Sequence, residues 1–293
     1  MGAALENTTI TPQRSISSEQ LRGLALILPS VILIVALFVV PLGRLTLQSF
    51  TYPELGLHNY IAALTDPLIW KVLFITFQIS AIVTAACLVI GYAVALSLTL
   101  ASPRLRRLMF FFVLVPFWTS TLIKSYAWVI ILSRRGVLNT LFAYLAIPEQ
   151  SLIYNRTGTI IGMVYIMLPY MILSLYPVMI SIDKRLSEAS ASLGASDFEG
   201  FCRIFLPLSA PGIFAGSLIV MILSLGFFIT PALLGSPRDL MVSVYIDVQI
   251  ERLLNWGMAT SVSVILLVIT IALTIALRRI AIKNPKGFAM ERT

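Results

Sequence analysis

The most specifically spaced residues lie in a polar stretch, Glu188–Pro207, that interrupts an otherwise apolar sequence. We expect two short helices here, joined at Gly194, because glycine adopts the left-handed backbone that closes a helix at no steric cost. Ser196 stands three residues before Glu199, the capping-box spacing that opens a helix. Most outward residues of the stretch are small, so the backbone of another protein can approach closely. We call residues 183–211 the elbow and predict that it is a docking element.

The order of residues in the elbow resembles the EAA loop of the membrane subunits of binding-protein-dependent ABC importers. The family motif is Glu-Ala-Ala, three residues, Gly, nine residues and Ile-x-Leu-Pro, and the elbow departs from it only at Ser190, which replaces the second Ala. The resemblance implies that the elbow docks onto a separate ATPase subunit. It also implies that Glu188 either caps a helix or makes a charged contact across that surface. The residues it assigns to ATPase coupling are Glu188, Ala189, Ser190, Gly194, Asp197, Ile204, Leu206 and Pro207.

Polar groups inside apolar segments are costly, and are therefore candidates for contact with a substrate. The richest cluster runs from Pro116 to Trp128 and contains Lys124, which either lines a pathway, pairs structurally or extends to the outer surface. Pro231, in a later apolar segment, permits a bend that suits a moving helix. We predict a pathway lined by Trp118, Lys124, Tyr165, Phe228 and Thr230.

Nothing in the sequence indicates an enzyme. There is no Gly-x4-Gly-Lys-Ser/Thr loop to hold a nucleotide phosphate and no nucleophile–base pair. Cys87 and Cys202 belong to different levels of the predicted topology, which argues against a disulfide, and with a single His they cannot supply a metal site. We therefore expect no cofactor in this chain, and its energy must come from a partner.

The composition is that of a membrane protein. Of the 293 residues 58% are hydrophobic and 12% charged, whereas soluble domains carry about 25% charged residues. A helix needs about 20 apolar residues to cross the bilayer. Apart from closed β-barrels, only helices pair all their backbone N–H and C=O groups internally, as lipid requires. We therefore predict an all-α integral membrane protein with six spans. They are Leu24–Leu47, Val72–Leu100, Leu108–Leu132, Thr159–Ile182, Gly212–Leu234 and Thr260–Ile282.

The basic residues predict the orientation. The net charge of +8 does not require nucleic acid, because no long Lys/Arg run is present and basic residues gather on the cytoplasmic side of membrane proteins. Most of the 21 Lys and Arg residues fall in the tails, the 101–107 turn and the elbow, which places these segments in the cytoplasm. The predicted organisation is a cytoplasmic tail at 1–23, a six-helix permease domain at 24–282 and a cytoplasmic tail at 283–293.

Several local signals concern the connecting segments. Asp66 followed by Pro67 is a helix start. The 136–147 segment has one apolar face, which predicts a helix in the membrane interface, and 235–257 contains a similar piece. Gly-x3-Gly pairs begin at Gly158 and Gly212 and favour close helix packing.

Further stretches resemble the spermidine/putrescine-type permeases and their iron, sulfate, phosphonate and opine relatives. They are 116–118, 126–128, 136–139, 230–235 and 255–256. The resemblance implies a type I ABC importer permease fold in the bacterial inner membrane, surrounded by lipid. It implies as partners a second homologous permease, two ATPase subunits that bind ATP and Mg, and a periplasmic substrate-binding protein.

The expected cargo is a small polar solute such as a polyamine, an opine or an amino-acid-like compound. The absence of Asp and Glu from the predicted spans weakens the case for a simple polyamine without excluding it. The alternative is a stand-alone secondary transporter or channel. That class is expected to carry coupling-ion groups, typically carboxylates, at the middle of the membrane.

Overall fold

The computed structural model describes residues 27–52 and 54–283, which form helices and connecting turns without strands. The chain divides into two units, residues 1–48 and 49–293. The described part of the first unit lies in the helix Ile27–Thr51, which includes the π-helical turn η1 (Val35–Val39) and continues into α2 (Val40–Thr51). The predicted tail 1–23, the start of the first span and most of the tail 283–293 lie outside the described residues.

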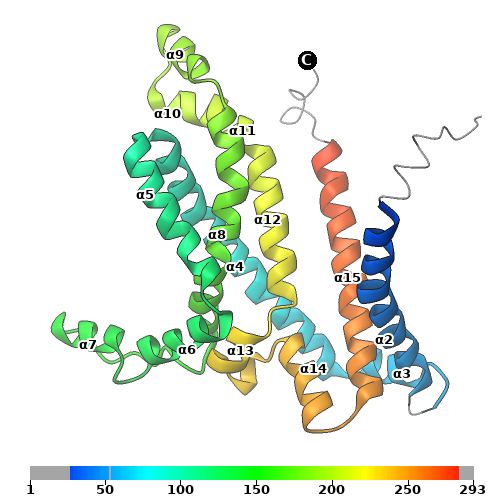
Figure 1. Ribbon diagram of the computed structural model, residues 1–293. Coiled ribbons are helices and arrows are strands. Elements are labelled where there is room, and N and C mark those ends of the chain that lie inside the picture. The colour runs from blue at the N-terminus through cyan, green and yellow to red at the C-terminus, as the bar shows by residue number, and fades with distance from the viewer. Residues whose placement is uncertain (1–26, 53, 284–293) are drawn as a thin grey trace, which may run out of the picture. The chain divides into compact units, whose positions relative to one another are not determined.

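The centre of the second unit is a packed group of three helices: α4 (Pro67–Leu100), α8 (Arg156–Ser181) and α12 (Ala210–Leu225) (Figure 1). The predicted start of α4 is confirmed, because an Asp66 side-chain oxygen accepts a hydrogen bond from the Leu68 N–H at 2.8 Å. Its far end is capped by Arg106 of α5 (Pro103–Leu114), which donates to the Leu98 carbonyl at 2.9 Å. α8 runs through two prolines without ending.

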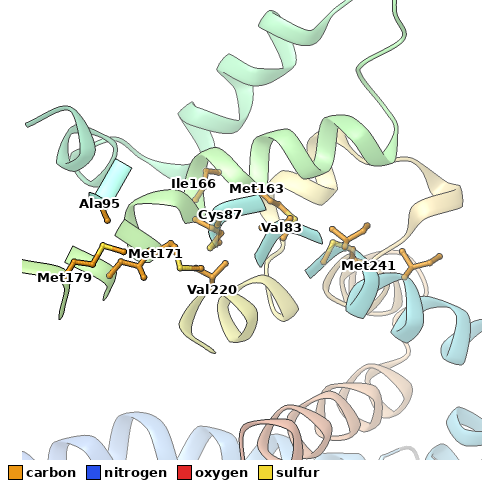
Figure 2. Close-up of a cluster of buried hydrophobic side chains, with 13 residues drawn as sticks. Val83, Cys87, Ala95, Met163, Ile166, Met171, Met179, Val220 and Met241 are labelled. Carbon is orange, nitrogen blue, oxygen red and sulfur yellow. The ribbon is translucent and has the colours of Figure 1, made fainter. Parts of the chain in front are cut away.

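Methionine dominates the core between these helices (Figure 2). Met163, Met167, Met171 and Met179 of α8 are almost fully buried, with Val83 and Cys87 of α4 against them. Methionine is unbranched and fills irregular gaps with little strain. The core is therefore apolar yet adaptable along the length of α8.

The glycine pair of α12 lies against α8, as the spacing predicts. A Cβ added to Gly212 would lie 3.1 Å from Cβ of Val178 and 3.3 Å from Cα of Leu175, and one added to Gly216 would lie 2.6 Å from Sδ of Met171. The backbones of α8 and α12 approach this closely only because neither position carries a side chain.

We expect Gly212→Val to destabilise the protein by about 1–3 kcal/mol, the usual cost of overpacking a well-packed contact. The obstructing atoms at this position include α8 backbone, which cannot move aside locally. Thermal melting of the purified protein in detergent measures the effect. Gly226→Val is the control, because a Cβ there would meet no atom within 4 Å; equal melting temperatures for the two variants would contradict the prediction.

Among the described residues, four helices are long and apolar enough to cross a membrane, or up to six if each of two bent pairs counts as one span. The four continuous helices are Ile27–Thr51, Pro67–Leu100, Arg156–Ser181 and Trp256–Arg279, the last lying within α15 (Trp256–Lys283). Each overlaps a predicted span.

The other two predicted spans are not continuous, and here the expected bounds are wrong. The helix expected over 108–132 breaks after η2 (Val115–Trp118), and the chain turns by 103° into α6 (Thr121–Leu132). The helix expected over 212–234 stops at Leu225 and restarts as α13 (Ile229–Leu234).

A proline lies beside each break. Pro116 lacks the N–H that would continue α5, and the chain tightens there into the 3₁₀ turn η2 that precedes the first break. Pro231 stands in the first turn of α13, where the missing N–H would have no intrahelical partner in any case. Pro231 therefore marks the start of α13 rather than a bend within a long span. Thr119 and Ser120 are extended at the first break, and hydroxyl side chains favour such non-helical backbone.

The end of the unit opposite the elbow is built from shorter helices: α3 (His58–Thr65), α7 (Val137–Tyr144), α14 (Val242–Glu251) and a 3₁₀ turn at Pro237–Asp239 (Figure 1). α7 confirms the helix expected within 136–147. α14 lies within the 235–257 segment, where a similar helix is expected, and near its start the Val242 N–H donates to the Thr76 hydroxyl at 2.9 Å.

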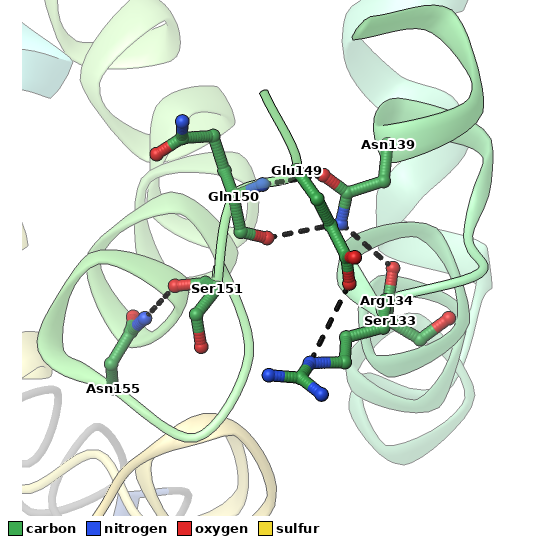
Figure 3. A network of polar contacts seen from close by, with 7 residues as sticks. All are labelled: Ser133, Arg134, Asn139, Glu149, Gln150, Ser151 and Asn155. Atoms are coloured by element: carbon green, nitrogen blue, oxygen red, sulfur yellow. Dashed lines mark hydrogen bonds and ion pairs between the residues drawn. The ribbon is translucent and has the colours of Figure 1, made fainter. Parts of the chain in front are cut away.

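A polar network fixes the connection from α7 to α8 (Figure 3). The side-chain amide of Asn139 donates to the carbonyls of Ser133 and Gln150, at 3.2 and 3.0 Å, and its oxygen accepts from the Gln150 N–H. Arg134 and Glu149 form an exposed ion pair at 3.5 Å, worth little by itself. The buried Asn139 is thus the main fastening of this loop.

Candidate functional site

The elbow has the local structure that its sequence predicts. α9 (Lys184–Ser192) is followed by Gly194 at φ +86, and the Ala195 N–H donates back to the Ser190 carbonyl at 3.1 Å. This closure is a Schellman motif, which requires a left-handed residue at the glycine position. The second segment opens with the capping box of Ser196 and Glu199.

The second segment of the elbow is helical throughout: α10 (Asp197–Gly200), the π-helical η3 (Phe201–Phe205) and α11 (Leu206–Leu208). It then bends by 59° into α12. Pro207 lies inside the second segment and does not end it. The bend lies at Ser209, and Pro211 stands in the first turn of α12. The elbow is thereby joined directly to one of the three central helices.

Tyr92 of α4 fastens the elbow to the body of the unit. Its hydroxyl shares a hydrogen bond of 2.9 Å with the Ser209 hydroxyl, at the bend itself. Its ring meets that of Phe201 edge-on, with centroids 6.0 Å apart. The elbow is therefore attached to α4 as well as to α12.

The residues assigned to coupling do not all lie on one surface. Glu188, Ala189, Gly194 and Asp197 are exposed, together with Leu206 and Pro207, whereas Ile204 is half-buried. Ser190 is partly buried against Gly200, where an added Cβ would lie 3.0 Å from its hydroxyl. A small residue at position 190 therefore serves packing between the two elbow helices.

Two elbow residues outside the motif stand out. Leu193 is 90% exposed and Phe198 75% exposed, on either side of Gly194. Large apolar side chains at such exposure mark surfaces that another protein covers when they form a patch. Sequence reasoning missed both, although a leucine and a phenylalanine flanking a glycine in a polar loop were visible signals.

Beneath the elbow lies a cavity of about 570 Å³ between α9, α10 and the ends of α4 and α8. Leu96, Met179 and Phe201 supply apolar walls, and Glu188 and Asp197 reach its rim. Among the side chains that the structure describes, the Glu188 carboxylate has no ion-pair partner.

The five predicted pathway residues fall near the two helix breaks. Trp118 ends η2 and is 76% exposed, and Phe228 precedes α13 and is 38% exposed. Tyr165 of α8 is 38% exposed and meets Trp128 of α6 with ring centroids 5.6 Å apart. These three side chains are therefore exposed in part in the isolated chain.

Lys124 and Thr230 lie differently. The Lys124 ammonium donates to the Pro116 carbonyl at 2.9 Å, across the break, instead of extending away from the chain. Thr230 is fully buried, and its hydroxyl shares a hydrogen bond of 2.8 Å with that of Ser125. Both therefore contact the helices that carry the exposed aromatic residues.

Possible metal and thiol chemistry is limited. Within residues 27–52 and 54–283, no three His, Cys, Asp or Glu side chains come together in a group that could hold a metal ion. Cys87 is a free thiol buried in the core, and Cys202 a free thiol in η3.

Comparison with known proteins decides what this arrangement belongs to. Residues 87–283 match the family described as the binding-protein-dependent transport system inner membrane component. The chain belongs to this family. It is thus an inner-membrane permease subunit of an ABC importer, itself non-catalytic, while ATP hydrolysis belongs to partner ATPases. Membership decides against the stand-alone secondary transporter.

Relatives of the permease include the spermidine/putrescine transport system permease protein PotB of Escherichia coli K12. The two are 39% identical over 219 residues, which cover 73% of this chain and 79% of PotB. PotB of Haemophilus influenzae is 36% identical over 217 residues, covering 73% of this chain and 75% of that protein. The permease protein YdcU of E. coli K12 is 32% identical over 212 residues and 67% of each chain.

Solved structures confirm the fold. A chain of a bacterial alginate ABC transporter, crystallised with an alginate-bound periplasmic protein, superposes with a TM-score of 0.77 at 17% identity, over 90% of the permease and 94% of that chain. A second alginate importer structure gives 0.70 at 17% identity, over 94% and 97%. The permease therefore has the all-helical ABC importer fold. In this family the partners are a second permease, ATPases and a periplasmic binding protein.

Proposed function

We propose that the permease takes up the force of ATP hydrolysis at its elbow and uses it to move a small polar solute from the periplasm to the cytoplasm. The observation that carries the proposal is the closure at Gly194, which holds two short helices at a fixed angle and leaves an exposed surface of small residues around it. A rigid projection of this kind can transmit force without deforming.

The elbow and the basic 101–107 turn lie at one end of the second unit, which supports a cytoplasmic position for both of them. Arg106 binds the last carbonyls of α4, and residues of that same helix end line the cavity beneath the elbow. The described end of α15 lies at this end too (Figure 1). Because the tails at 1–23 and 283–293 share the excess of Lys and Arg found in the elbow and the 101–107 turn, we assign both termini to the cytoplasm as well.

The partner at the elbow is an ATPase subunit that binds ATP and Mg. Leu193 and Phe198 insert into its groove as apolar anchors, and the small residues between them permit close approach of its backbone. Glu188, with no described partner of its own, pairs with a cationic side chain of the ATPase. Anchors of this kind, well packed at the centre of an interface, carry most of its binding energy.

The pathway passes the two helix breaks, where Trp118, Tyr165 and Phe228 present exposed aromatic surface. A second, homologous permease supplies the opposite wall. Lys124 and Thr230 contribute from behind this wall.

The cargo is a polyamine. The relatives that bear the name spermidine/putrescine permease support this assignment, with identities of 36–39% over most of the chain. Aromatic faces attract ammonium groups, which offers an organic cation a favourable contact in a wall without carboxylates. Opines and amino-acid-like solutes share the ammonium group and are the next candidates.

The test is uptake of labelled spermidine into vesicles that contain the complete importer. We expect uptake to require ATP, and Glu188→Ala to reduce it by a factor of roughly 5 to 150 by removing a charged contact worth about 1–3 kcal/mol. Replacing Glu149, an exposed acid at the opposite end, by Ala is the control and leaves uptake unchanged. Full uptake by Glu188→Ala would reject the coupling role. Uptake of sulfate or neutral sugar but not of any amine would reject the cargo.

A further inference from the structure

The two broken spans meet at the first turn of α6. Lys124 and Ser125 are consecutive residues of α6; Lys124 binds across the first break, and Ser125 binds the segment that follows the second break. The Lys124 ammonium reaches back to Pro116 in η2, before the first break, at 2.9 Å. The Ser125 hydroxyl bonds to Thr230 in α13, after the second break, at 2.8 Å.

The contact of Lys124 is suited to a helix end. The carbonyls that close a helical segment carry the negative end of its dipole and need donors. The Pro116 carbonyl also accepts from the Thr119 N–H, at a long 3.4 Å, so the ammonium is its stronger partner. The two ion pairs formed by the described side chains do not involve Lys124. Among the described residues, the Lys124 ammonium therefore contacts a backbone carbonyl rather than a carboxylate.

The contact of Ser125 is suited to a permanent joint. Ser125 and Thr230 are both fully buried, so water does not compete for their hydrogen bond. The Thr230 methyl lies over Gly162 of α8, where an added Cβ would be only 2.7 Å away. On the other side of the second break, the Ser243 hydroxyl donates to the Phe227 carbonyl at 2.6 Å.

We propose that Lys124 and Ser125 form a clasp that makes the two broken spans move as one. The elbow continues into α12, and α12 leads to α13; the clasp then carries the motion from α13 through α6 to η2. Trp118 and Phe228 consequently open and close together. Lys124, Ser125 and Thr230 are positioning residues: they do not bind the cargo but hold the residues that do. The proposal rests on the pathway wall given above.

The test uses matched substitutions in the complete importer in vesicles, measured as solute transported per ATP hydrolysed. Lys124→Met keeps the length of the side chain and removes its donors, whereas Lys124→Arg keeps the donors. Thr230→Val keeps the methyl over Gly162 and removes the hydroxyl. Thr230→Ser keeps the hydroxyl and removes the methyl. We expect the Met and Val variants to lose roughly tenfold in solute per ATP, the size of one charged or buried hydrogen bond, and the Arg and Ser variants to retain most of it.

The clasp also predicts which kinetic parameter of transport changes in the Lys124→Met and Thr230→Val variants. The apparent KM should stay within about twofold while the maximal rate falls, and cationic and neutral cargo analogues should be affected alike. A rise in KM confined to charged cargo would overturn the proposal and make Lys124 a ligand. Combining Lys124→Met with Thr230→Val should cost no more than the worse single change, because either one opens the clasp; fully additive losses would also overturn it.

Assembly is measured alongside. If Lys124→Met fails to assemble, the Thr230 pair alone decides, because that hydroxyl can be removed with its packing intact. Normal coupling in the Thr230→Val variant overturns the clasp. Glu188→Ala is measured in the same preparation to test the proposed function separately. If Glu188→Ala loses transport but Thr230→Val does not, the coupling role of the elbow stands and the clasp is rejected.

Discussion

We expect Gly194→Val to abolish transport while the permease still inserts into the membrane. Gly194 sits at φ +86, where a β-branched residue is strongly disfavoured, by more than the roughly 1–2 kcal/mol that an ordinary residue costs there. A Cβ at this position would meet no atom within 4 Å, so the effect comes from the backbone alone. The closure of α9 then opens, and the angle between the two elbow helices is lost.

The control is Gly194→Asn, since asparagine is the residue that best tolerates the left-handed conformation after glycine. We expect this variant to retain most of the uptake. The measurements are ATP-dependent uptake in vesicles and the amount of permease in the membrane fraction. Equal uptake by the Val variant and the unmodified protein would show that the elbow angle does not matter.

Phe198→Asp separates the permease from its ATPase. Phe198 is 75% exposed on the elbow and contacts solvent in the isolated chain, so the change costs the folded permease little. An aromatic anchor at the centre of an interface contributes about 2–4 kcal/mol, and a buried unpaired carboxylate adds a further penalty. We expect ATPase recovered with tagged permease to fall by a factor of roughly 100.

Phe198→Trp preserves an aromatic anchor and should retain the ATPase. Tyr144→Asp is a second control, because Tyr144 is 85% exposed but lies in α7, at the opposite end of the unit. If both Asp variants lose ATPase equally, the cause is general damage to the permease. If neither does, Phe198 is not part of the docking surface.

The elbow could be predicted closely because its structure is local. The left-handed glycine and the capping box each depend on residues within one or two turns, and both agree with expectation. The start of α4 at Asp66 and Pro67 is readable for the same reason. The docking residues Leu193 and Phe198 were missed because exposure is a property of the folded surface, not of the motif.

The two helix breaks were not predicted because the spans were identified by hydropathy, which is the same whether an apolar segment continues as one helix or turns. The sequence around Thr119 and around Gly226 is apolar enough for lipid whether the helix continues or turns. Whether the helix breaks depends on whether the backbone groups freed at the break find new hydrogen-bond partners. Those partners, Lys124 for the Pro116 carbonyl and Ser243 for that of Phe227, come from other segments.

Four buried methionines run along α8, where it faces α4 and α12. Branched side chains interlock with their neighbours, and sliding one helix past another would force them over steep rotational barriers. Thioether chains instead rotate through several shapes of similar energy. The packing around α8 can therefore accommodate small changes in side-chain shape, because its methionines can adopt new rotamers without leaving gaps in the core.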